Sequence, residues 1–116
     1  MALTNKSFVF LLAGVLQTGS LWASQPGATD LSSLAKSKVC LGCHQVEGKR
    51  VGPSFVQVAQ RHAGQPGAED YLVAAIRQGG RGRWGAVPMP AQPQVSEEDA
   101  RRLAQWILTL KPSEKQ

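Results

Sequence analysis

The sequence predicts a small all-α domain built from four or five short helices. Apolar residues recur in several stretches at intervals of three and four positions, which is the period of one helix face. Segments rich in Gly and Pro separate these stretches, and none of them shows the strict alternation of a half-buried strand. A chain of 116 residues has room for one such domain.

Residues 1–23 have the pattern of a secretory signal peptide. Lys6 supplies a positive charge, Phe8–Leu16 form a short apolar core, and small and polar residues lead to Ala23. We expect cleavage after Ala23, export to the periplasm, and a single domain over residues 24–116. The alternative is an uncleaved anchor, but the apolar run is shorter than the roughly 20 residues of a spanning helix. Stable membrane insertion is therefore not expected.

The first helix is expected between Asp30 and Cys40. Thr29 is a possible N-cap with Asp30 in the first turn, and Lys36 and Lys38 lie late in the helix, where cations are favoured. Its apolar side chains share one face and are Leu31, Leu34, Ala35 and Val39.

A C-x-x-C-H motif follows this helix, formed by Cys40, Cys43 and His44. This pattern is the attachment site of a c-type haem. Positions i, i+3 and i+4 lie on one face of a helical turn, so all three side chains can address one planar group. We therefore expect one haem c, attached covalently through Cys40 and Cys43, with His44 as an iron ligand.

Three alternatives remain for the same residues. A zinc site could use Cys40, Cys43, His44 and His62, although the adjacent Cys43 and His44 make tetrahedral closure awkward. A thioredoxin-like dithiol requires a preceding strand, which the sequence does not predict. A Cys40–Cys43 disulfide would close a very small loop and stabilise little.

Three further helices are expected after the motif. The second covers Ser54–His62, and the third covers Ala68–Gln78 with Gly79 as its C-terminal stop. The last begins at Ser96, whose following acidic residues suit a helix start, and ends at Lys111. Each of these helices has one apolar face. The second has Phe55, Val58 and Ala59, the third has Tyr71, Leu72, Ala75 and Ile76, and the last has Leu103, Trp106, Ile107 and Leu110.

The segment 79–95 is too rich in Gly and Pro for regular structure, yet it contains Trp84 and Met89. Met89 is the only methionine after residue 23, and it lies between Pro88 and Pro90. These prolines restrict the backbone on either side, and a stiff loop can hold a weak ligand with little loss of entropy.

Met89 is therefore predicted as the second axial ligand of the iron. A thioether favours ferrous iron relative to a second imidazole. The only other histidine apart from His44 is His62, which we interpret as a surface or helix-end residue.

Together these residues resemble the short class I, single-haem cytochromes c of bacteria. These are periplasmic carriers that serve terminal oxidases and nitrite reductases. The resemblance covers residues 30–111 and rests on the following motifs: C-x-x-C-H at 40–44, V-G-P at 51–53, W-G at 84–85, P-M-P at 88–90, and V-S-x-x-x-A with A-x-W-I-L in the last helix.

The resemblance implies a class I cytochrome c fold wrapped around the haem, with further site residues. Pro53 should accept a hydrogen bond from Nδ1–H of His44 through its carbonyl oxygen. Trp84 should lie beside the haem and donate its indole N–H to a propionate. The first and last helices should pack against each other.

The sequence departs from the family at two positions. Ala75 replaces a basic residue that reaches a propionate in many relatives, so Arg77 or Arg83 is expected to compensate that charge. An asparagine that steadies the methionine sulfur in relatives is missing, and Gln92 is the candidate replacement.

We therefore expect a monomeric electron carrier and not an enzyme. The formal net charge is +5, and loss of Lys6 with the leader leaves about +4. This charge favours acidic redox partners. Arg77, Arg81 and Arg83 are either steering residues for such a partner or only part of a solvated loop. Nucleic acid is not expected as a partner. The alternative function is a haem protein with an open sixth position that binds small ligands or peroxide.

Overall fold

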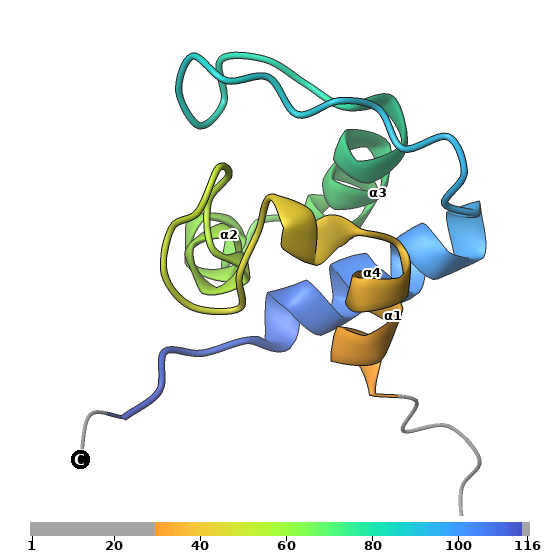
Figure 1. Cartoon of the computed structure of the whole chain (residues 1–116). Helices are drawn as coiled ribbons and strands as arrows, with labels where there is room; N and C mark the ends of the chain where they lie inside the picture. Colours follow the sequence, from red (N-terminus) through yellow and green to blue (C-terminus); the bar gives the residue numbers. More distant parts are fainter. Residues whose placement is uncertain (1–29, 115–116) are drawn as a thin grey trace, which may run out of the picture.

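The computed structural model describes residues 30–114, and this part of the chain is helical. The elements are α1 (Leu31–Ser37), the 3₁₀ turn η1 (Cys40–Gly42), α2 (Phe55–His62), α3 (Ala68–Gln78) and α4 (Glu97–Thr109) (Figure 1). Residues 30–114 contain no strand, only an isolated bridge between Gly80 and Met89. The all-α prediction is confirmed. The predicted signal peptide lies outside the described residues.

The start and end of α1 differ from the prediction. Asp30 is the N-cap and not a first-turn residue, since its carboxylate accepts a hydrogen bond from the Ser32 amide at 3.1 Å. The helix ends at Ser37 and does not reach Cys40, because Val39 has a left-handed backbone with φ of 64°. The C-x-x-C-H motif therefore begins a separate 3₁₀ turn.

The other helices begin and end close to the predicted positions. Ser54 caps α2 in a reciprocal capping box with Gln57, in which each side chain bonds the other residue's backbone amide. Ser96 caps α4 by accepting a hydrogen bond from the Asp99 amide at 3.0 Å. The bounds of α3 are as predicted, with Gly79 at its end in a conformation with φ of 71°.

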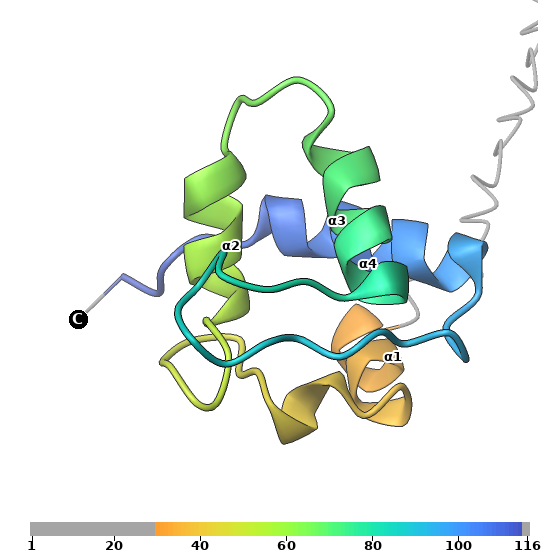
Figure 2. The same cartoon turned by 90° about the horizontal axis from the view of Figure 1, so that it is seen from above.

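The core lies where α4 packs against the other three α-helices. Figure 2 shows α4 crossing beneath α2 and α3 when the molecule is seen from above. The predicted packing of the first helix on the last is present. The buried core residues include Ala35, Phe55, Leu72, Ile76, Leu103 and Ile107.

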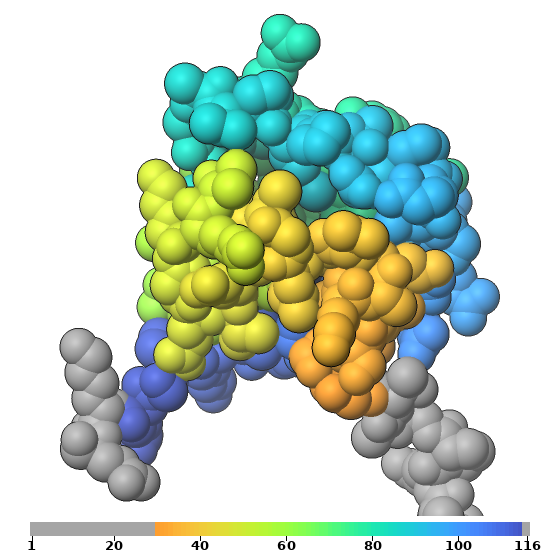
Figure 3. Space-filling model, viewed as in Figure 1, coloured from red at the N-terminus to blue at the C-terminus, as the bar shows by residue number. Residues whose placement is uncertain are grey.

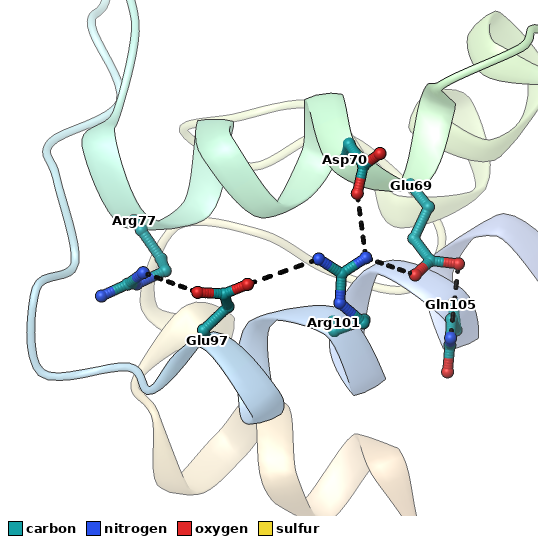
Figure 4. Close-up of polar contacts among 6 residues, drawn as sticks. All are labelled: Glu69, Asp70, Arg77, Glu97, Arg101 and Gln105. Atoms are coloured by element: carbon teal, nitrogen blue, oxygen red, sulfur yellow. Dashed lines mark hydrogen bonds and ion pairs between the residues drawn. The ribbon is translucent and has the colours of Figure 1, made fainter.

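Exposed ion pairs join α3 to α4 on the outer face of this helix pair. Arg101 contacts Glu69 at 2.8 Å and Asp70 at 2.9 Å, and Glu97 lies between Arg101 and Arg77 at 3.5 and 3.7 Å (Figure 4). Such exposed pairs each contribute about 0–1 kcal/mol, so apolar burial dominates the packing of this pair.

The segment 79–95 runs from the end of α3 to the start of α4 across the face that also carries η1 (Figures 1 and 2). In the space-filling view, its teal and light-blue residues lie above the gold and yellow residues that follow α1 (Figure 3). The backbone amide of Gln92 donates a hydrogen bond to the Ile76 carbonyl at 3.1 Å, and the Val95 side chain is fully buried. These contacts fasten the returning half of the segment to the core.

No helix within residues 30–114 has the length and apolar character needed to cross a bilayer.

Candidate functional site

The imidazole of His44 is held on three sides. Its Nδ1 lies 2.7 Å from the carbonyl oxygen of Pro53, so Nδ1 carries the proton and donates it to this bond. Its ring stacks on Phe55, with centroids 5.2 Å apart and planes 19° apart. Gly52 lies against the ring, because a Cβ at this position would meet Cε1 at 2.5 Å. The remaining nitrogen, Nε2, is left with its lone pair available to a metal.

The two cysteines lie on the turn just before His44. Both are free thiols; Cys40 is half-buried and Cys43 is exposed. Burial raises the pKa of the Cys40 thiol above its ordinary value. The His44 amide donates a hydrogen bond to the Cys40 carbonyl at 3.0 Å, which closes a helical turn and brings His44 back to the side of Cys40.

Two adjoining clefts open beside this turn. The main cleft encloses about 960 Å³ of empty space, its open mouth included. The side cleft reaches the motif itself and is also lined by Cys40. The residues that line both clefts are Cys43, His44, Phe55, Ile76, Met89, Pro90 and Ile107.

Met89 lines both clefts on a backbone that is tightly positioned. Its amide and carbonyl pair with those of Gly80 at 2.9 and 3.0 Å. Gly79 allows the chain to pass this closely, because a Cβ there would collide with the Met89 carbonyl and lie 2.7 Å from the Ala91 amide nitrogen. Gln92 lines the side cleft, and its side-chain amide donates to the Pro90 carbonyl at 3.2 Å.

Trp84 and two arginines form part of the wall of the main cleft. Trp84, Arg81 and Arg83 all line it. Arg77 does not; its guanidinium pairs with Glu97 at the start of α4 instead. Of the two candidates for propionate compensation, Arg83 therefore lies at the cleft and Arg77 does not. Arg77 also lies apart from the other two residues of the predicted steering group, Arg81 and Arg83, which both line the cleft.

Arg61 is a residue of this site that sequence reasoning missed. Its guanidinium carbon lies 4.4 Å from the centroid of the Trp84 ring, and it donates a hydrogen bond to the Arg83 carbonyl. The sequence shows only a cation in the last turn of a helix, far along the chain from Trp84. No local pattern signals their meeting.

From the sequence, His62 is interpreted as a surface or helix-end residue. It is the last residue of α2, but it is buried and not on the surface. Its Nδ1 lies 3.2 Å from Gln65 Oε1, and its ring lies against Tyr71 with centroids 4.8 Å apart. His62 lines neither cleft that holds His44. Among residues 30–114, no three His, Cys, Asp or Glu side chains gather as a metal site, so the four donors of the zinc alternative are not brought together.

These residues fit a haem. The clefts place two free thiols, an imidazole whose Nδ1 proton is already bonded, and a thioether along apolar walls. Glycines at positions 52 and 79 keep space beside His44 and Met89 that any side chain would fill.

Comparisons with known proteins agree with this fit. The family model described as "Cytochrome c" matches residues 31–111. Cytochrome c-551 of Stutzerimonas stutzeri is 46% identical over 102 residues, which cover 87% of this chain and 97% of that protein. Cytochrome c-552 of Hydrogenobacter thermophilus is 50% identical over 78 residues, or 67% of this chain and 79% of that protein.

A solved structure shows the same similarity in three dimensions. The crystal structure of Nitrosomonas europaea cytochrome c552 superposes with a TM-score of 0.68 at 48% sequence identity. The superposition covers 69% of this chain and 99% of that chain.

Proposed function

The chain belongs to the cytochrome c family of haem-containing electron-transport proteins, and we propose that it carries single electrons between respiratory redox partners in the periplasm. In this proposal one haem c would be attached through Cys40 and Cys43, and His44 and Met89 would bind its iron. Bound there, the haem supplies the one-electron Fe(II)/Fe(III) chemistry.

One observation carries the proposal. His44, from the turn after α1, and Met89, from the segment between α3 and α4, line the same two clefts. With both residues on the iron, no coordination position is left for a substrate. That arrangement suits a carrier and not a catalyst.

The chain's own residues keep this site rigid. The Pro53 carbonyl accepts a hydrogen bond from His44 Nδ1–H, which fixes the ring and the donor strength of Nε2. Pro88 and Pro90 restrict the backbone of Met89, which is also paired with Gly80. A site that moves little between oxidation states exchanges electrons with little reorganisation.

Optical spectroscopy of the ferric holoprotein tests the ligation. We expect a low-spin spectrum with a sulfur-to-iron charge-transfer band in the red. The band should vanish in Met89→Ala and persist in Val87→Ala, which truncates an exposed side chain of the same segment.

A high-spin wild-type spectrum, with ready binding of cyanide or carbon monoxide at neutral pH, would instead support the alternative of an open sixth position. A pyridine haemochrome assay tests the covalent attachment separately.

We further propose that the partner is acidic. Arg61, Arg81 and Arg83 are exposed beside the main cleft, and none of them forms an ion pair with another residue in the described range 30–114. Electron transfer to such a partner should slow as ionic strength rises. Arg81→Gln should weaken this salt dependence more than Lys36→Gln, which removes the same charge from α1.

Export is part of the proposal because the pattern of residues 1–23 predicts it. N-terminal sequencing of the holoprotein recovered from the periplasm tests it, and we expect the mature chain to begin at Ser24.

A further inference from the structure

The tip of the segment between α3 and α4, residues 81–88, has little support of its own. Every residue in it is exposed. In the described chain, none of its backbone groups bonds another backbone group; the nearest such bonds are those between Gly80 and Met89 at its base. Gly82 and Gly85 have positive φ values of 68° and 114°, with no atom of another segment near either. This loop tip therefore needs side-chain contacts to stay in place.

Two arginine–aromatic contacts meet this need, and they run in opposite directions. Arg61 of α2 lies over the ring of Trp84 in the loop tip, 4.4 Å from its centroid. Arg83 of the loop tip lies over the ring of Tyr71 in α3, 4.8 Å from its centroid. Arg61 also donates a hydrogen bond to the Arg83 carbonyl, which joins the two contacts. Figure 2 shows the teal tip of the segment beside α2.

Neighbouring residues support Tyr71 and Arg83 in these contacts. His62, the residue after Arg61 in α2, is buried, and its ring lies against the ring of Tyr71 with centroids 4.8 Å apart. A Cβ on Gly80 would lie only 3.0 Å from the Arg83 guanidinium carbon, so the glycine leaves room for Arg83 to fold back onto Tyr71.

We propose that these contacts form a clasp that holds the loop tip closed over the main cleft, with Arg61 and Arg83 as positioning residues. Trp84, Arg83 and Val87 of the loop tip line that cleft. Release of the clasp would leave only the bonds between Gly80 and Met89 to hold the tip. This proposal rests on the proposed function in two respects only: that a haem fills the cleft, and that Met89 binds its iron.

Hydrogen exchange in the intact holoprotein tests the clasp directly. The Gly80 and Met89 amides bond each other's carbonyls, so their exchange reports opening at the base of the loop tip. An exposed cation–π contact corresponds to a factor of about 2–5 in an opening equilibrium. We expect exchange about three-fold faster in Arg61→Gln and Arg83→Gln, and on the order of ten-fold faster in the double variant.

Two variants serve as controls. Arg81→Gln removes the same charge from the same loop tip but breaks no arginine–aromatic contact seen in residues 30–114, so its exchange should match the wild type. Arg61→Lys keeps the charge but loses the planar group, so it should open more than the wild type. Equal exchange in all variants, or faster exchange in Arg81→Gln than in Arg61→Gln, would overturn the proposal.

Imidazole binding to the ferric protein is the second measurement. If the closed tip keeps competing ligands from the iron, imidazole binding should accelerate in Arg61→Gln and Arg83→Gln by the same factors. It should stay unchanged in Lys36→Gln, which removes the same charge from α1 and lines neither cleft. Unaltered binding in the double variant contradicts closure over the cleft. A wild-type protein without the sulfur-to-iron band would refute the Met89 ligation, while hydrogen exchange would still decide the clasp.

Discussion

Gly52 lies directly against the His44 ring, and replacing it with alanine should disturb this side of the site. The new Cβ would lie 2.5 Å from Cε1, 2.8 Å from Nδ1 and 3.2 Å from Nε2 of His44. Carbon atoms in ordinary contact lie about 3.5–4.0 Å apart, so either the ring or the 50–53 backbone must retreat by roughly 1 Å.

Both ways of relieving this contact lose a hydrogen bond. Retreat of the ring breaks the 2.7 Å bond from His44 Nδ1 to the Pro53 carbonyl, and retreat of the backbone breaks the 2.8 Å bond from the Gly52 amide to the Cys43 carbonyl. Overpacking typically costs about 1–3 kcal/mol, and a lost hydrogen bond costs about 0.5–1.5 kcal/mol. We therefore expect Gly52→Ala to lower the free energy of unfolding by about 2–4 kcal/mol.

Guanidinium unfolding of the holoprotein, followed by far-ultraviolet circular dichroism, measures this loss. A redox titration of the same samples provides a second readout. If the ring retreats, Nδ1–H of His44 loses its acceptor and Nε2 becomes a weaker donor. The midpoint potential should then rise.

Gly42→Ala is the matched control. A Cβ at Gly42 would have Val39 Cγ1 at 3.7 Å as its nearest neighbour, which is ordinary contact, although the residue lies in the same motif as His44. This variant should stay within about 0.5 kcal/mol of the wild type. If Gly52→Ala is as stable as Gly42→Ala, then Gly52 does not set the position of the His44 ring.

Two further predictions concern the ends of α1 and α4. Val39→Gly should raise the free energy of unfolding by about 1 kcal/mol in a denaturant titration, because a left-handed backbone costs an L-residue about 1–2 kcal/mol. Val87→Gly is the control, because Val87 is 63% exposed and Val39 is 72% exposed, but of the two only Val39 has a positive φ. Val87→Gly should therefore not stabilise the protein. A Val39→Gly variant that is less stable than the wild type would contradict the strain argument. The Asp99 carboxylate accepts a 2.9 Å bond from Lys38, which lowers the pKa of Asp99 below its ordinary 3.8. The ion pair therefore contributes fully to the free energy of unfolding above the ordinary pKa, and this contribution is lost as the pH falls through the lower pKa of the folded state. Between about pH 5 and 2, the free energy of unfolding should therefore fall less in Asp99→Asn than in the wild type.

The helices and their caps were largely predictable because their signals are local. The apolar period placed α3 at its observed bounds. Ser54 and Ser96, where the sequence predicts that two helices start, are the N-caps of α2 and α4. The contact from His44 to the Pro53 carbonyl, expected from the family resemblance, is present. Local propensity failed at Val39, because a β-branched residue gives no warning of a left-handed backbone.

Spacing along the chain was enough to predict the attachment and ligand chemistry available to this protein: paired thiols next to a histidine, and a methionine between two prolines. It could not predict which cations lie beside the cleft, because that depends on how the helices pack. Arg77 lies beside the segment 79–95 in sequence, yet it turns to Glu97, while Arg61 reaches Trp84 from another helix. The physical reason is that periodicity and spacing describe the faces of one helix. The contacts between segments depend on how α2, α3 and α4 pack around a shared core.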